Sequence, residues 1–152
     1  MGDLLQPTHL LILFFAAFLL YLPLIFYILT LSRVLAKCSV PSIAIKPGML
    51  WLLLIPLVGL IEHFFVVIGL AKTLSNEFRT RNIPNMEPLP GQSIGIAMCV
   101  CGACGIIPLI GLFASLAGFV LWIIYWAKIA EFSRVLDRDR VQGEGQIPRF
   151  NF

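Results

Sequence analysis

Residues 9–31 read HLLILFFAAFLLYLPLIFYILTL, a nearly continuous apolar run that decides the class of fold. An α-helix needs about 20 apolar residues to cross the hydrocarbon core of a bilayer, so this run is long enough. No Lys or Arg precedes it and no Ala-x-Ala-like cleavage site follows it, so we expect a retained transmembrane helix rather than a signal peptide. Thr8 is expected to cap this helix and Pro23 to kink it.

Three further apolar segments predict an all-α integral membrane helical bundle of about four transmembrane helices. Hydrophobic residues make up 59% of the 152 positions and charged residues only 12%, about half the share usual in soluble domains. We therefore expect a single membrane domain over residues 1–152, with a polar loop at 82–90 and an extramembrane tail at 131–152. The predicted spans are residues 9–31, 49–70, 93–107 and 112–130.

The third predicted span is the shortest, and two alternatives remain for it. Residues 93–126 carry no charge, and this run is too long for one span and short for two. The segment 105–111 contains Gly and Pro, which favour a turn that divides the run. Residues 93–107 then either cross the membrane or form a re-entrant helix that returns to the face from which it came.

The distribution of Lys and Arg predicts the orientation, because cytoplasmic flanks carry the excess of basic residues. With four spans, one side holds Arg33, Lys37 and Lys46, and the other holds the remaining eight of the 11 basic residues. This split predicts that both termini are cytoplasmic. A re-entrant third segment would keep the tail on the richer side and move the N-terminus to the other side.

Two ionisable residues, Glu62 and His63, lie in the middle of the second predicted span. Ionisable groups at that depth are costly and commonly mark a functional site. His63 is therefore a candidate cofactor ligand, for a haem iron or a chlorophyll magnesium, and Glu62 is a candidate proton relay. The alternative is structural, with a neutral Glu62 hydrogen-bonded to a neighbouring helix and His63 packed beside it. The sequence identifies no cofactor.

Three cysteines, Cys99, Cys101 and Cys104, lie in the third predicted span, and Cys38 is distant along the chain. A zinc or iron–sulfur site usually takes four ligands from loops that bend around the metal. Helical geometry instead turns Cys99 nearly opposite to Cys101. We therefore predict no metal site here, and small residues that allow close helix packing, as in the small-x-x-x-small patterns that begin at positions 91 and 114.

Aromatic residues gather near the end of the fourth predicted span. Trp122, Tyr125 and Trp126 precede Lys128, and aromatic rings beside a basic residue are typical of the membrane–water interface. We predict that these four side chains anchor the helix at one face of the membrane.

Two stretches carry a family resemblance: KPGMLWLLLIP at 46–56, which continues through Phe64 to Arg79, and the segment from Ser115 to Ala130. They resemble an uncharacterised family of small bacterial multi-span membrane domains, sometimes found behind a GYF-like domain, over roughly the last two thirds of the chain. This chain has no GYF-like domain, and Glu62-His63 stands where the family leads us to expect Asn or Trp. That family has no assigned activity, so the resemblance implies the bacterial cytoplasmic (inner) membrane and no chemistry.

The sequence contains no P-loop, dinucleotide fingerprint, nucleophile elbow or metalloprotease helix, so no catalytic motif indicates an enzyme. No basic stripe or stacking platform indicates nucleic acid binding. We expect a non-catalytic accessory or structural subunit of a larger membrane complex, respiratory or photosynthetic, because the loop and the tail would need other protein subunits to order them. The alternatives are a homo-oligomeric transporter or channel component and a small redox or pigment-binding protein that uses His63.

Overall fold

The computed structural model describes residues 6–84 and 87–145. These residues form α-helices and short 3-10 helices, and no strand occurs among them, so the expected all-helical class is confirmed. Three of the helices, α1, α2 and α4, are long and apolar enough to cross a membrane. The elements in chain order are α1 (Pro7–Lys37), η2 (Val40–Ser42), η3 (Pro47–Leu54), α2 (Pro56–Thr80), α3 (Gln92–Cys104) and α4 (Ile110–Gly145).

The long apolar run forms α1, which has 31 residues and continues through Pro23. Pro7 occupies the first turn, where a helix has no internal partner for the N–H group that proline lacks. The N-cap is Gln6 and it makes no side-chain capping bond, so the prediction that Thr8 caps the helix is wrong. The helix ends at Lys37, where the Cys38 N–H donates to the Leu35 carbonyl.

The second predicted span needs correction, because the chain turns back on itself within it. Residues 47–54 form η3, and Ile55 is extended (φ −89°, ψ 112°) before Pro56. A residue that precedes proline avoids the helical region, which separates η3 from α2. Gly59 permits the tight return, since a Cβ added there would lie 2.6 Å from the Leu53 carbonyl oxygen. The membrane-length helix is therefore α2, which continues to Thr80.

The end of α2 is set by a local hydrogen-bond pattern. Asn82 has a positive φ of 54°, which Asn tolerates better than most residues. The N–H of Ile83 donates to the Phe78 carbonyl at 2.9 Å, and the N–H of Asn82 donates to the Arg79 carbonyl at 3.2 Å. These two bonds form a Schellman motif, which satisfies carbonyls that the helix leaves free.

The third and fourth predicted spans correspond to α3 and α4. The 13 residues of α3 extend about 20 Å, which is less than the roughly 30 Å of a hydrocarbon core. The chain then turns through Leu109, whose φ is 65°, and enters α4. Residues 131–145 of the predicted tail continue α4 as a helix, and residues 146–152 lie outside the described part.

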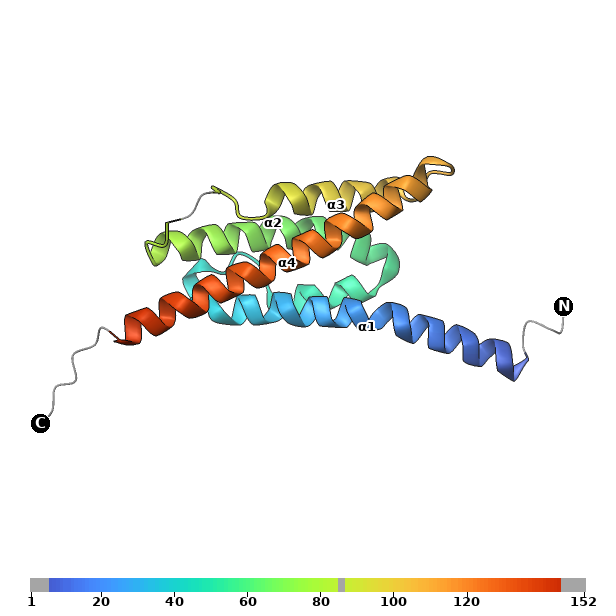
Figure 1. Ribbon diagram of the computed structural model, residues 1–152, viewed down its shortest axis with the longest axis horizontal. Coiled ribbons are helices and arrows are strands. Elements are labelled where there is room, and N and C mark those ends of the chain that lie inside the picture. Colours follow the sequence, from blue (N-terminus) through green and yellow to red (C-terminus); the bar gives the residue numbers. More distant parts are fainter. Residues whose placement is uncertain (1–5, 85–86, 146–152) are drawn as a thin grey trace, which may run out of the picture.

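Figure 1 shows two hairpins, η3–α2 and α3–α4, beside the C-terminal half of α1. Both hairpin turns point toward the N-terminal end of α1, and we call them the tips (residues 52–58 and 105–111). The opposite end is the base, where α1 and α2 end and α4 leaves the bundle. The Pro7 end of α1 and the Gly145 end of α4 lie at opposite ends of the molecule, whereas the four-span prediction expects both termini on one side.

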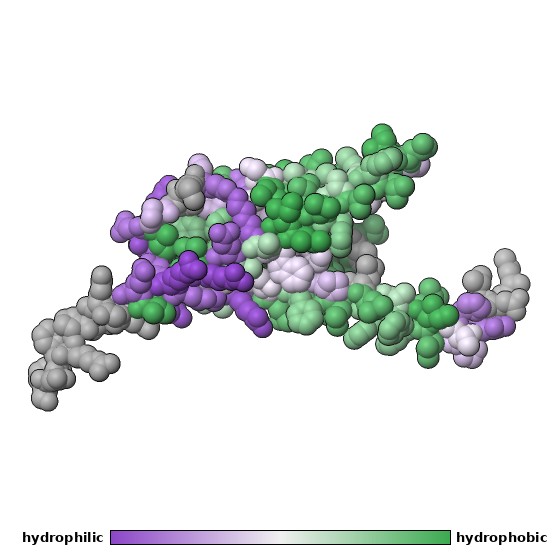
Figure 2. Space-filling view, in the orientation of Figure 1, coloured by the Kyte–Doolittle hydropathy of each residue, from purple (hydrophilic) through white to green (hydrophobic). Residues whose placement is uncertain are grey.

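Polar and apolar surfaces separate along the long axis. Figure 2 shows hydrophilic residues gathered around the base and hydrophobic residues along most of the remaining face, with a smaller hydrophilic group at the N-terminal end of α1. The tips read LLLIPLV and GIIPLIG, so neither contains a polar side chain. They are well exposed, as Leu57 at 82% and Leu109 at 90% illustrate.

The buried core lies where the C-terminal half of α1 meets η3, α2, α3 and α4. The predicted close packing of small residues is confirmed at two positions. A Cβ added at Gly95 would lie 2.4 Å from a Val67 methyl, and one added at Gly118 would lie 3.2 Å from the Cβ of Cys101. The largest fully buried side chains include Tyr27, Leu31, Leu50, Leu70 and Tyr125.

Candidate functional site

His63 lies on α2 and contacts α1 through one hydrogen bond. Its Nε2 is 3.0 Å from the hydroxyl oxygen of Tyr27, which is fully buried. The two rings also contact each other, with their centroids 5.7 Å apart. Because the tyrosine ring is fixed in the core, this bond holds the imidazole in one orientation.

Three aromatic rings from α4 surround Tyr27. The ring centroids of Trp122, Tyr125 and Trp126 lie 5.5, 6.4 and 6.2 Å from that of Tyr27. Trp126 also donates its indole N–H to the Thr30 hydroxyl at 3.0 Å. Tyr125 is only 1% exposed and so belongs to the packed core, whereas the interface role of Trp122, Trp126 and Lys128 stays a prediction. The aromatic spacing on α4 matches the inner face that packs on α1.

A groove of about 310 Å³ opens beside His63, between α2, α3 and α4. Its walls are mostly apolar, and Gly102 and Gly118 keep it open. The lining residues with polar groups are His63, Ser115, Cys99 and Trp122, whose indole has one N–H. The volume is at the lower end of the usual range for small-molecule sites. The role of His63 as a cofactor ligand stays a prediction. The arrangement can hold one polar group of an otherwise apolar molecule.

Glu62, the neighbour of His63 on α2, lies in different surroundings. Its Oε1 atom is buried and has no hydrogen-bond partner among the described residues. Consecutive helical residues diverge by about 100°, so the two side chains serve different neighbours. Within the described residues, Glu62 makes no hydrogen bond to Tyr27, whereas His63 does. The structure therefore brings His63, but not Glu62, into the aromatic cluster.

The cysteines are dispersed. Cys99 is buried and lines the groove, while Cys101 and Cys104 are partly exposed on other faces of α3. Within residues 6–84 and 87–145, no group of three or more His, Cys, Asp or Glu side chains is placed to hold a metal ion. Cys38 lies apart at the base, where burial raises the pKa of its thiol to about 11.

The base contains a buried charged network that the sequence analysis missed. Glu77 is 1% exposed, and its Oε2 accepts hydrogen bonds from the Ser39 N–H at 2.9 Å and the Ser39 hydroxyl at 2.6 Å. Its Oε1 accepts a bond from the Arg81 Nε at 2.7 Å. The i, i+4 spacing of Glu77 and Arg81 was a visible signal for this pair. Nothing in the sequence indicated that Ser39 would complete it.

Arg81 connects this network to two other helices. Its Nη2 donates to the Lys37 carbonyl at 2.8 Å, which satisfies a free carbonyl at the end of α1. Its Nη1 contacts the Asp139 carboxylate of α4 at 3.4 Å. Lys37 in turn donates to the Ser133 hydroxyl at 2.6 Å and to Asp137 at 2.7 Å. The C-termini of α1 and α2 are thereby joined to α4.

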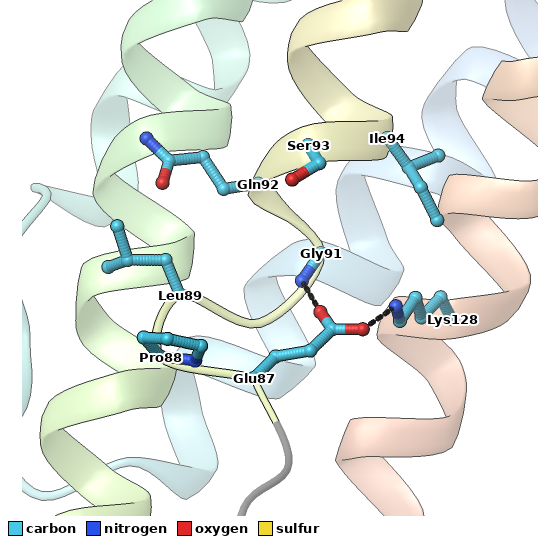
Figure 3. Close-up of a pocket in the computed structure, with 8 residues that line it drawn as sticks. All are labelled: Glu87, Pro88, Leu89, Gly91, Gln92, Ser93, Ile94 and Lys128. Carbon is cyan, nitrogen blue, oxygen red and sulfur yellow. Dashed lines mark hydrogen bonds and ion pairs between the residues drawn. The ribbon is translucent and has the colours of Figure 1, made fainter.

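Figure 3 shows a second pocket at the base, at the N-terminal end of α3, where Glu87 points between Gly91 and Lys128. The Glu87 carboxylate accepts the Gly91 N–H at 2.9 Å and pairs with the Lys128 ammonium. Both contacts hold the pKa of this carboxyl below its ordinary value. Because the Lys128 ammonium is already paired with Glu87, this pocket does not offer an unpaired cation to an anion.

Contacts within the chain also involve the loop at 82–90, and the expected role of other subunits there stays a prediction. Besides the Glu87 contacts, the Ser75 hydroxyl donates to the Pro88 carbonyl at 2.7 Å, and Ile83 packs on the core. The described residues of the loop are thus held by contacts within their own chain. Asn85 and Met86 lie outside the described part.

Comparison with protein families, curated proteins and solved structures finds no match to this chain. The resemblance to a family of bacterial membrane domains therefore stays a prediction. The geometry described above is the basis for the proposals that follow.

Proposed function

We propose that this chain is a non-catalytic integral membrane protein that serves as an accessory or structural subunit of a larger assembly in the bacterial cytoplasmic membrane. The observation that carries the proposal is the first part of α1, residues 7–19, which we call the α1 arm. Its large apolar residues, from Leu10 at 50% to Phe14 at 75%, are exposed. Such a helix, apolar on every side, is suited to contact lipid and the helices of other subunits.

The topology that we propose has one crossing helix and two re-entrant hairpins. At 1.5 Å per residue, α1 begins about 30 Å before Tyr27, whereas α2 begins only about 10 Å before His63, its partner at the same depth. Likewise α4 begins about 24 Å before Trp126, and α1 about 34 Å before Thr30. The two tips thus stop short of the start of α1, at different depths.

The chemistry of the tips supports the same topology. Neither tip offers a polar side chain to water, and their backbone groups are joined within the turns, as in the bond from the Gly111 N–H to the Ile107 carbonyl. Backbone inside a membrane must be satisfied in this way. Both hairpins would then return to the base, and all the Lys and Arg residues would lie on the side of the membrane where the base is. Because cytoplasmic flanks carry the excess of basic residues, the base would be the cytoplasmic side. The N-terminus would lie on the other side.

A photo-crosslinking residue in the α1 arm tests the subunit role. We expect a crosslinker at Phe14 to capture a specific protein from the native membrane. The matched control is Phe65, an exposed phenylalanine (57%) on α2 of the packed bundle, which should yield only lipid adducts. Lipid adducts alone from Phe14 would contradict the proposal. Capture of a second copy of this chain would instead favour the homo-oligomeric transporter or channel.

Reporter fusions test the topology separately. A reporter placed before Pro7 should respond as non-cytoplasmic, and reporters inserted in the loop after Thr80 and at the end of α4 should respond as cytoplasmic. A cytoplasmic signal from the first position would contradict the single crossing and support the four-span alternative.

A further inference from the structure

The groove beside His63 has the features of a ligand site rather than of a packing defect. Its apolar walls include Leu60, Met98 and Trp122, and its exposed rim includes Phe119 at 57%. All of these lie in helices that we treat as membrane-embedded, so a ligand would enter from the bilayer. A site of this kind selects for an apolar body and for a few hydrogen bonds in fixed positions.

Two polar groups in the groove are available to a ligand. The Nε2 of His63 is taken by Tyr27, and no hydrogen bond to its Nδ1 occurs among the described residues. When the Tyr27 hydroxyl donates to Nε2, the proton of a neutral imidazole lies on Nδ1, which then donates. The Ser115 hydroxyl is a second donor in the groove, and it too makes no hydrogen bond within the described part. Both donors suit an acceptor such as a carbonyl oxygen.

The shape of the groove favours a flat ring. The Trp122 and Phe119 rings lie 6.0 Å apart with an interplanar angle of 30°, which gives the groove an aromatic side on which a ring can stack. The absence of a side chain at Gly102 leaves space, since a Cβ added there would meet only Leu60, at 3.8 Å. The volume of about 310 Å³ suits one ring system with the start of a chain.

We propose that this groove binds the ring of a lipid-soluble quinone, with His63 donating a hydrogen bond from Nδ1 to one carbonyl oxygen of the ring. The apolar tail of the quinone would extend past Phe119 into the lipid. Tyr27 acts as a positioning residue, because its hydroxyl lies 3.0 Å from Nε2 and so holds the orientation of the imidazole. The proposal concerns binding and does not depend on the subunit role.

The test measures how decylubiquinone partitions into nanodiscs that hold the full chain, relative to empty nanodiscs. We expect saturable binding of one quinone per chain. His63→Leu should weaken it roughly fivefold to tenfold, as expected for the loss of one hydrogen bond. His63→Gln, which keeps an N–H donor, should restore most of it. The control His9→Leu, at the start of α1 and far from the groove, should bind as the native protein does.

Two further measurements separate a quinone site from a passive gap. Gly102→Leu fills the groove and should abolish saturable binding, and decylbenzene, which has a ring and a tail but no carbonyl, should not compete. The ring ¹⁵N signals of His63 should shift on addition of the quinone to the native chain, a readout that needs no variant. Unshifted His63 signals, or equal affinity for decylbenzene, would overturn the proposal and assign the groove to lipid chains.

Discussion

At the base, hydrogen bonds to charged groups join α1, the segment after it, α2 and α4. At the tips no polar side chain occurs, and the turns are held by backbone hydrogen bonds and van der Waals contacts. The base therefore depends on the chemical identity of Glu77 and Arg81. The tips depend on the absence of side-chain atoms, as at Gly59. The comparison teaches that one small membrane protein can be held together by hydrogen bonds and ion pairs at one end and by close apolar packing at the other.

Among substitutions at the base and the tips, Glu77→Leu should cause the largest loss of stability. The substitution leaves the Ser39 N–H and the Arg81 guanidinium without their partner in a nearly closed site. We expect a loss of about 3 kcal/mol in the free energy of unfolding, the lower part of the range for breaking a buried ion pair, because Arg81 keeps some exposure. Unfolding in mixed detergent micelles measures it. Glu131→Leu, at an exposed position of α4, is the matched control and should change little.

The reactivity of the Cys38 thiol gives a second measurement of the loss of structure at the base that Glu77→Leu should cause. In a background with Ala at the three cysteines of α3, the buried Cys38 should react slowly with maleimide at neutral pH, because its raised pKa leaves little thiolate. Adding Glu77→Leu should speed the reaction by opening the base. An unchanged rate would mean that the base keeps its structure without the buried carboxylate.

Gly59→Ala should damage the tips more than any polar change there. The added Cβ would approach the Leu53 carbonyl oxygen to 2.6 Å, and backbone atoms cannot move aside as a flexible side chain can. Overpacking of this kind costs about 1–3 kcal/mol in stability. Gly48→Ala is the matched control, since nothing lies within 4 Å of a Cβ added at that position. Equal stability of the two variants would show that η3 and α2 separate easily.

The tip between α3 and α4 should become more stable when Leu109 is replaced by Gly. Leu109 has a φ of 65°, a conformation that costs an L-residue about 1–2 kcal/mol and glycine almost nothing. We expect a gain of about 1 kcal/mol in the free energy of unfolding. Leu112→Gly, three residues later inside α4, should have the opposite sign and lose about 1 kcal/mol.

The smallest effect should come from Glu87→Gln at the rim of the base. Hydrogen bonding to the Gly91 N–H and the Lys128 ammonium lowers the pKa of Glu87 from its ordinary value of 4.5. A lowered pKa contributes stability that is present above that value and is lost as the pH falls through the folded-state value. The native chain should therefore be slightly more stable than the variant above about pH 4.5, and this difference in the free energy of unfolding should disappear as the pH falls below that value. A difference that is constant with pH would contradict the role of the carboxylate charge.

The sequence predicted the helices well, because membrane helices are recognised by length and apolar composition alone. It failed where a contact distant in the chain decides the structure. The run at 49–70 looked like one span, and the close approach of Gly59 to Leu53 makes it a hairpin. Tyr125 looked like an interface residue, and its position facing Tyr27 makes it part of the core.

The candidate site was found only in part, for the same reason. His63 stood out because an ionisable residue in an apolar run is conspicuous, whereas its partner Tyr27 is one aromatic among many in α1. The groove depends on Gly102 and Ser115 from two other helices, and no local pattern joins them to His63. Glu77 was hidden among the charged residues that follow α2, where most side chains face water.

The apolar tips also bear on how the chain enters a membrane during synthesis. In the proposed topology each hairpin inserts from the cytoplasmic side as a closed loop, and no residue of it has to leave the other face. Between Lys46 and Lys72 the only charged residue is Glu62, and between Glu87 and Lys128 there is none. Moving one charge fully across a membrane at 100 mV involves about 2.3 kcal/mol, and neither hairpin transfers one. Insertion of the α3–α4 hairpin would therefore be indifferent to the membrane potential, whereas the η3–α2 hairpin would respond only through Glu62, which moves part of the way into the membrane.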